Sequence, residues 1–223
     1  LVEAFEGSTA DKQDVGRVDL DQGLFGMLAA ALGRNRRDRA FEMDGLLARA
    51  AARGVTVGTW IDVGASDGSW SLRARRHFPS SRFLLYEPLA ERQAELAALT
   101  RRHGFVIAAA AAGAARGTIA FSVAPSLDGS GVATPGTAGT RTVPVDTIDR
   151  LIAQHALPAP FALKLDTHGH ELPVLAGAAD ALQDLLANRI RILGPDHPDT
   201  LTTRHNLAWC RGQAGDPQGA ADA

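Results

Sequence analysis

The segment from Trp60 to Ser69, which reads WIDVGASDGS, joins a short apolar run to an acid and a glycine turn. A helical pattern follows it. In an open α/β sheet, ligands bind beyond the carboxyl ends of the strands, and the loop after the first strand needs glycine so that its backbone can approach the ligand. Gly64 and Gly68 do not form the G-x-G-x-x-G loop that binds a pyrophosphate, and Asp62 would repel phosphate. The segment therefore favours a nucleoside without phosphates.

A second apolar run, RFLLYEP over residues 82–88, also ends in an acid. Glu87 follows Gly64 at close to the spacing of about 20 residues at which an acid binds ribose hydroxyls in nucleotide folds. Acids at two strand ends suggest a ligand with a ribose and a cation, and S-adenosylmethionine offers both without a phosphate. In the simpler interpretation Asp62 closes a turn and Glu87 is solvated, but the two glycines of the same loop favour the cofactor site.

Four motifs follow one another along the chain: IDVGASDGSW, LLYEPL, VPVDTID and KLDTHGHELPVLAGA. With these motifs the chain resembles the FkbM family of S-adenosylmethionine-dependent methyltransferases, over roughly residues 45–182. The resemblance implies a class I methyltransferase fold and methylation of a hydroxyl, often on a sugar or a natural product. By matching position it implies that Asp62, Gly64 and Glu87 hold the cofactor. The family pattern D-x-x-G-x-E falls on Asp166, Gly169 and Glu171.

The candidate site residues lie at the ends of the expected strands. We expect the cofactor to be bound by Asp62, Gly64, Ala65, Ser66, Gly68, Glu87 and Ala110. Methyl transfer is an in-line displacement, so alignment of the acceptor oxygen contributes most, and a base that removes the hydroxyl proton adds a factor of about 10² to 10⁴. The candidate catalytic residues are Asp166, His170 and Glu171. We favour Asp166 as the base, with His170 as the second choice.

The segment that begins at Asp166 has other interpretations. Asp-x-His-x-His resembles a metal site, because alternate residues of an extended segment face one way. However, Gly169 interrupts the alternation and methyl transfer to oxygen requires no metal, so we predict none. In the plainest alternative, Glu171 caps the next helix and His168 is solvated. Lys164, inside an apolar strand, is expected to snorkel or to pair with an acid, without a catalytic role.

Alternating strand and helix patterns predict an α/β fold with a Rossmann-like parallel sheet of the class I methyltransferase type. After the first strand, further strands are expected at 82–87, 105–110 and 161–166, with an extra pair at 118–123 and 140–145. Helices are expected at 69–77, 89–103, 146–155 and 172–182. The loop at 125–139, rich in Gly, Ser, Thr and Pro, is either a mobile substrate lid or a disordered surface loop.

The chain divides into an N-terminal arm and two helices (1–54), a methyltransferase-like domain (55–182) and a helical tail (183–223). No strand is evident after Leu182, so the sheet is expected to be truncated on its C-terminal side, with one edge covered by the tail. The tail resembles a partial tetratricopeptide-like repeat, and one such unit is no array. It is a candidate site for a protein partner. The alternative to an active enzyme is therefore an inactive methyltransferase remnant that serves protein interaction.

Composition narrows the class of protein. A chain of 223 residues with 45% hydrophobic content can bury a core, and a net charge of −2 gives no electrostatic case for nucleic acid or anionic membrane. No apolar run approaches the length of about 20 residues that spans a bilayer, and the acids within residues 1–16 are unlike a signal peptide. Cys210 is the only cysteine, which makes a reducing cytoplasm the default. We expect a cytoplasmic enzyme with a small hydroxylated substrate. The missing pyrophosphate loop counts against a dehydrogenase.

Overall fold

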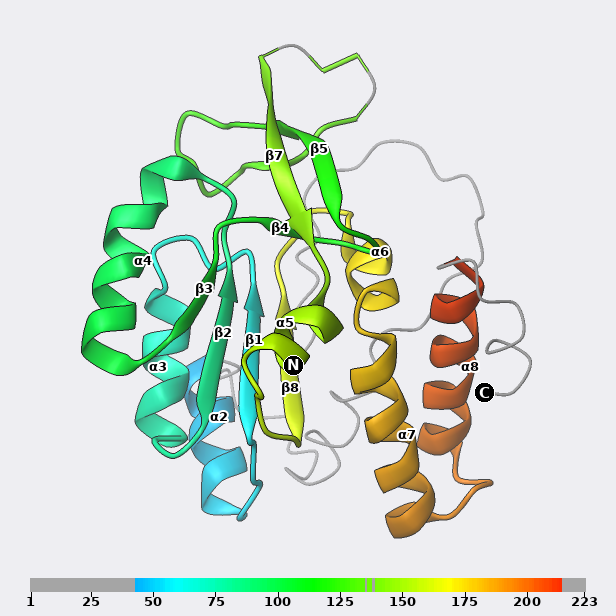
Figure 1. The fold of residues 1–223 in the computed structure, drawn as a ribbon. Coiled ribbons are helices and arrows are strands. Elements are labelled where there is room, and N and C mark those ends of the chain that lie inside the picture. Colours follow the sequence, from blue (N-terminus) through cyan, green and yellow to red (C-terminus); the bar gives the residue numbers. More distant parts are fainter. Residues whose placement is uncertain (1–42, 135, 138, 214–223) are drawn as a thin grey trace, which may run out of the picture.

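The computed structural model describes residues 43–134, 136–137 and 139–213 (Figure 1). The expected N-terminal arm, the first of the two N-terminal helices and the last part of the tail lie outside these residues. The second expected helix is α2, Met43–Ala52, which buries Leu46, Leu47 and Ala50.

Sheet A is parallel and has the strand order β3-β2-β1-β8. Its strands are β1 (Thr59–Val63), β2 (Arg82–Tyr86), β3 (Val106–Ala108) and β8 (Phe161–Leu165). Helices α3 (Ser69–His77) and α4 (Ala90–His103) connect the first three strands. The predicted α/β fold with a parallel, Rossmann-like sheet is thus confirmed. The order reverses between β1 and β8, which creates a topological switch point at the carboxyl ends of these strands.

The core lies on both faces of sheet A because successive side chains of a strand point to opposite faces. Trp60 of β1 packs on one face, with ring centroids 5.5 Å from Trp70 of α3 and 5.1 Å from Phe78. Its neighbour Ile61 belongs to the cluster on the other face, together with Leu84 and others. This double burial explains why β1 and β2 read as nearly continuous apolar runs.

Sheet B crosses the carboxyl end of sheet A, as Figure 1 shows for β5 and β7. Its order is β4-β7-β5-β6, in which only the β4–β7 pair is parallel. The strands are β4 (Ala111–Ala112), β5 (Gly117–Ser122), β6 (Gly131–Val132) and β7 (Thr140–Asp146). The extra pair expected from the sequence corresponds to β5 and β7. The two-residue strands β4 and β6 carry too short a pattern to be predicted.

After β8 the described chain is helical, as expected. Helix α5 (Ile148–Gln154) precedes β8. Strand β8 is followed by the helices α6 (Glu171–Ala176), α7 (Ala179–Leu193) and α8 (Pro198–Gln213). Helices α7 and α8 form a hairpin beside β8 (Figure 1). Trp209 of α8 packs against the core cluster that contains Leu165 and Val174. The tail therefore joins the core of the domain; its likeness to a tetratricopeptide repeat remains a prediction.

The helix expected at 172–182 is interrupted at Gly177, where two helices meet. A Cβ at Gly177 would collide with the carbonyl oxygen of Gly113, so the chain passes close to another backbone segment there. The Gly177 carbonyl accepts from the Asp149 N–H at 3.0 Å. The Asp149 carboxylate in turn accepts from the N–H groups of Asp180 (2.9 Å) and Ala181 (3.1 Å) at the start of α7. As a result α7 begins at Ala179 and continues across the domain boundary expected at residue 182.

Candidate active site

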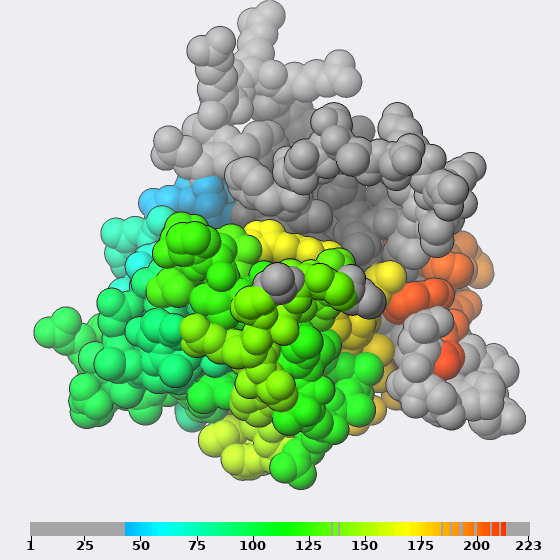
Figure 2. All heavy atoms as spheres, turned by 90° about the horizontal axis from the view of Figure 1, so that it is seen from above, coloured from blue at the N-terminus to red at the C-terminus, as the bar shows by residue number. Residues whose placement is uncertain are grey.

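A cavity of about 400 Å³ lies beyond the carboxyl ends of sheet A, at the switch point between β1 and β8. This volume is within the range typical of small-molecule sites. Its walls come from the segments that follow β1, β2, β3 and β8, and part of its cover comes from β5, β6 and the residues before β6. Figure 2, which looks onto this end of the molecule, shows the atoms of sheet B and its connections spread across the centre of the face.

The wall at β1 and β2 is held by short backbone hydrogen bonds to one carboxylate. Glu87 accepts from the Ser66 N–H and the Leu89 N–H, both at 2.9 Å. Burial raises the pKa of Glu87, and these two N–H groups oppose the rise. Each carboxylate oxygen keeps a second lone pair. Glu87 can therefore hold the loop in shape and still accept from a ligand hydroxyl in the cavity.

The glycine loop brings the end of β1 close to the end of β8. Gly64 has φ +75°, and a Cβ there would collide with the carbonyl oxygen of Asp166. Ser66, also in the left-handed region at φ 49°, lines the cavity beside Ala65. Gly68, at φ +77°, is outside the cavity lining, and a Cβ on it would collide with Leu99 of α4. Glycine is thus required at two places for two different close contacts.

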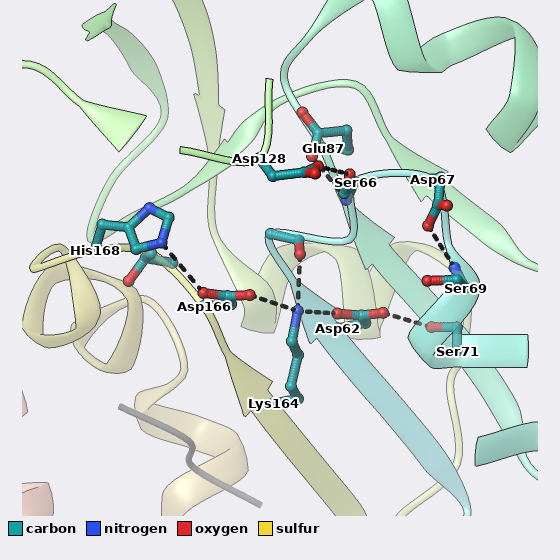
Figure 3. A network of polar contacts seen from close by, with 12 residues as sticks. Asp62, Ser66, Asp67, Ser69, Ser71, Glu87, Asp128, Lys164, Asp166 and His168 are labelled. Atoms are coloured by element: carbon teal, nitrogen blue, oxygen red, sulfur yellow. Dashed lines mark hydrogen bonds and ion pairs between the residues drawn. The ribbon is translucent and has the colours of Figure 1, made fainter. Parts of the chain in front are cut away.

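Asp62 lies below the cavity and is fully enclosed. One carboxylate oxygen accepts from the Ser71 hydroxyl at 2.7 Å, and the other is 3.0 Å from the Lys164 ammonium (Figure 3). Burial raises the pKa of Asp62, while Lys164 and the Ser71 hydroxyl oppose that shift. The sequence suggested a direct cofactor contact; the structure instead places Asp62 outside the cavity lining, as a support for Lys164.

Lys164 was expected to snorkel or to pair with an acid, and it pairs. Its side chain is 7% exposed, and the ammonium donates to the Gly64 carbonyl at 2.8 Å. The pairing follows from the register of the sheet, in which Asp62 of β1 lies opposite Lys164 of β8. Unlike Asp62, Lys164 also lines the cavity. An apolar strand pattern interrupted by a lysine was the signal for this residue in the sequence.

Asp166 follows β8 and lies between two basic side chains (Figure 3). One carboxylate oxygen is 3.6 Å from Lys164 Nζ, and the other is 3.5 Å from His168 Nε2. Both distances are longer than a normal hydrogen bond, and the Asp166 side chain is 48% exposed. Its carboxylate therefore faces the cavity with room to accept a further hydrogen bond.

The next two candidates differ in their access to the cavity. His170 lines it, and burial lowers the pKa of this imidazole, which favours the neutral form that can accept a proton. Glu171 is outside the lining and accepts from the Thr167 hydroxyl (2.8 Å) and the Gly169 N–H (3.0 Å). Burial acts to raise the pKa of Glu171, but these hydrogen bonds outweigh it and the pKa is lowered. These contacts are the ones expected if Glu171 closes the turn before α6.

The loop at 125–139, which was expected to be either a substrate lid or a disordered loop, contacts both walls of the cavity. One oxygen of Asp128 accepts from the Ser66 hydroxyl and from Arg92 of α4, each at 2.9 Å. On the other side, His168 Nδ1 is 3.3 Å from the Ser130 carbonyl oxygen. The loop also contributes β6 to sheet B through its pairing with β5. It thus bridges the glycine loop after β1 and the segment after β8.

Most of the residues selected from the sequence meet in this cavity. Those that line it are Gly64, Ala65, Ser66, Glu87, Ala110, Asp166 and His170. Asp62, Gly68 and Glu171 lie outside the lining and contact residues that belong to it. Lining residues that the sequence did not assign to the site include Arg73, Arg92, Asp128 and Ser130. Arg92 and Asp128 come from a helix and a loop without a motif, so no local pattern marks them.

The cavity lining holds acidic side chains beside the basic side chains of Arg73, Arg92 and Lys164. Carboxylates of Glu87, Asp128 and Asp166 line the cavity, and Glu87 is placed at the end of β2 where an acid meets ribose hydroxyls. The turn after β1 does not have the G-x-G-x-x-G sequence of a pyrophosphate-binding loop. In the part of the chain that the structure describes, no group of three or more His, Cys, Asp and Glu side chains is placed to hold a metal ion. None of the described helices is long and apolar enough to cross a membrane.

Comparisons with known proteins give a family match and a similar solved structure. The family model described as "Methyltransferase FkbM domain" matches residues 62–200. Among solved structures, the crystal structure of methyltransferase FkbM from Methylobacillus flagellatus KT is similar, with 21% sequence identity and a TM-score of 0.41. The match covers 57% of this chain and 30% of that one, so the chain spans less than a third of the length of that protein. No curated protein is similar enough to count as a match.

Proposed function

The chain belongs to the FkbM methyltransferase family, and on this premise we propose that it is an S-adenosylmethionine-dependent O-methyltransferase acting on a hydroxyl of a small metabolite or sugar. The observation that carries the proposal is one cavity with two different walls. Glu87 and the Gly64 loop form a wall suited to a ribose, and Asp166 faces the same space from the end of β8. A cofactor on the first wall would present its reactive end toward the second.

Glu87 is the proposed main anchor of the cofactor ribose. Its two oxygens are fixed by backbone N–H groups, so its orientation is set before a ligand binds. Ala65, Ser66 and Ala110 would add backbone and surface contacts along the same wall. Bound S-adenosylmethionine would supply an electrophilic methyl group on a sulfonium. The chain's own part is to hold the acceptor oxygen in line with that methyl group.

Asp166 is the proposed proton acceptor for the substrate hydroxyl. Its carboxylate lies beside the switch point, half exposed to the cavity, where it can accept a hydrogen bond from the hydroxyl and then its proton. His170 lines the same region and is the second choice, because burial keeps its imidazole neutral. Polar side chains in the walls of the cavity can form hydrogen bonds with a hydroxylated acceptor.

Calorimetry with the full chain is the first test. We expect S-adenosylmethionine to bind with a dissociation constant in the micromolar range that is common for metabolic enzymes, and NAD to bind far more weakly because the pyrophosphate loop is missing. The second step is transfer of an isotope-labelled methyl group to a panel of sugars and other small hydroxylated compounds. Failure to bind S-adenosylmethionine would overturn the proposal. Binding without transfer to any hydroxyl in a broad panel would favour the inactive remnant.

A further inference from the structure

Lys164 is a buried cation in the middle of a strand that is otherwise apolar. Its side chain is 7% exposed, and burying an ammonium is unfavourable unless each of its protons meets an acceptor. Three acceptors surround it: Asp62 at 3.0 Å, the Gly64 carbonyl at 2.8 Å and Asp166 at 3.6 Å. Asp62 lies below the cavity, Gly64 belongs to the loop after β1, and Asp166 belongs to the proposed catalytic wall.

We propose that Lys164 is a positioning residue, which ties the carboxylate of Asp166 to the cofactor loop and so sets the angle at which Asp166 meets the acceptor hydroxyl. This inference rests on the proposed function for its chemical meaning, but the geometry can be tested without it. Of the two carboxylates that contact Lys164 Nζ, only that of Asp166 belongs to a residue that lines the cavity (Figure 3).

The same contacts argue against Lys164 as the proton acceptor. A proton acceptor needs a lone pair that faces the substrate, whereas Lys164 Nζ donates to the Gly64 carbonyl and lies beside two carboxylates, those of Asp62 and Asp166. Lys164 therefore acts through Asp166.

The contact between Lys164 and Asp166 is longer than the other two. At 3.6 Å it is an ion pair without a tight hydrogen bond, and the opposite oxygen of Asp166 has a similar contact with His168 at 3.5 Å. The contacts from Lys164 and from the His168 ring lie on opposite oxygens and restrict rotation of the carboxylate. Without Lys164, the carboxylate would keep only the His168 contact and would turn toward solvent.

A charge-balanced variant separates this role from a structural one. Lys164→Gln alone leaves Asp62 buried and unpaired, so it should lower the melting temperature strongly and is a poor test of function. The double variant Asp62→Asn/Lys164→Gln replaces the ion pair by two amides and should regain most of the melting temperature. It lacks the cation at Asp166, so we expect kcat to fall at least tenfold with the S-adenosylmethionine dissociation constant within about threefold of the unchanged chain.

Asp166→Asn supplies the coupling measurement. In the unchanged chain it should reduce kcat by about 10² or more, whereas in the double variant its further effect should be less than about tenfold, because the carboxylate is already misplaced. A merely structural lysine would give independent, multiplicative effects. A double variant that recovers both its melting temperature and its kcat would overturn the inference.

A crystal structure of the double variant without ligand provides a readout that does not depend on activity. The inference expects the Asp166 side chain to leave its position between residues 164 and 168. An unmoved carboxylate would overturn the positioning role. If the unchanged chain neither binds S-adenosylmethionine nor transfers a methyl group, the proposed function fails while this structural readout still decides the inference about Lys164.

Discussion

The two walls of the cavity are held in different ways. At β1 and β2, Glu87 is fixed by two backbone N–H groups at 2.9 Å, and the loop glycine Gly64 packs against the backbone of the opposite strand. After β8, Asp166 and His168 are nearly half exposed and meet at 3.5 Å. The first wall is preorganised, while the second is held by longer contacts between side chains.

This difference suits a site that binds one invariant ligand and one variable ligand. A cofactor of fixed shape gains affinity from groups that are ordered before it binds, because little entropy is then lost. The proposed acceptor hydroxyl needs a carboxylate that can adjust its hydrogen bonds during proton transfer. The substitutions considered next each remove a side-chain contact in one of the walls or in the elements that join or support them.

The largest effect is expected at the second wall, which follows β8. Asp166→Asn keeps the shape of the side chain but removes its basic charge, so kcat for methyl transfer should fall by about 10² or more while cofactor affinity is spared. Steady-state kinetics with an identified acceptor measure this. Asp196→Asn, on the exposed turn before α8, is a matched control and should have no effect.

His170→Ala is the comparison for that result. Near-normal turnover in Asp166→Asn together with collapse in His170→Ala would transfer the role of base to the histidine. Because burial lowers the pKa of His170, its imidazole would already be neutral at physiological pH and ready to accept the proton.

The next largest effect is expected at the preorganised wall. Glu87→Gln removes the charge that receives two backbone N–H groups and the proposed ribose hydroxyls, at a cost of about 1.5 to 3 kcal/mol. The dissociation constant for S-adenosylmethionine should rise about ten- to hundredfold by calorimetry. Glu91→Gln, whose carboxylate pairs with Arg141 outside the cavity, is the control. Equal affinity in both variants would contradict the ribose assignment.

A smaller effect is expected where the loop joins the two walls. Asp128→Ala removes the acceptor shared by Ser66 and Arg92, which are exposed contacts worth about 0.2 to 1 kcal/mol. Cofactor affinity should weaken by no more than about fivefold, and cleavage of the loop by a protease should become faster. Ser126→Ala, at an exposed position in the same loop, is the control. A cleavage rate equal to that of the control would show that Asp128 does not hold the loop.

The smallest effect concerns the support of sheet B. The Arg150 hydrogen bond lowers the pKa of Asp146 below its ordinary value of 3.8, so this carboxylate stabilises the fold above that pH and loses the contribution as the pH falls through the lowered value. Arg150 is 37% exposed, and solvent screening limits the contribution to about 1 kcal/mol or less. Asp146→Asn should lower the urea midpoint at pH 7 and make little difference near pH 2. An equal deficit at both pH values would mean that the charge is not responsible.

The sequence alone indicated the architecture of the first wall because its signals are local. Apolar runs that end in Asp62 and Glu87, each followed by a turn and a helical pattern, place acids at the carboxyl ends of parallel strands. The same reasoning placed Asp166 at the end of β8 and predicted the pair of strands that became β5 and β7. These patterns depend on residues within about ten positions of one another.

Only the tertiary structure decided which of these acids reaches the cavity. Asp62 and Lys164 are adjacent because β1 pairs with β8 in a register that joins residues about 100 positions apart, and the buried Asp62 lies outside the cavity lining. The break at Gly177 and the contact of Asp128 with Ser66 likewise depend on segments distant in the sequence. The sequence determined that acids stand at the strand ends, because strand patterns are local. The directions and partners of these acidic side chains were set by packing, which depends on segments that are distant in the sequence.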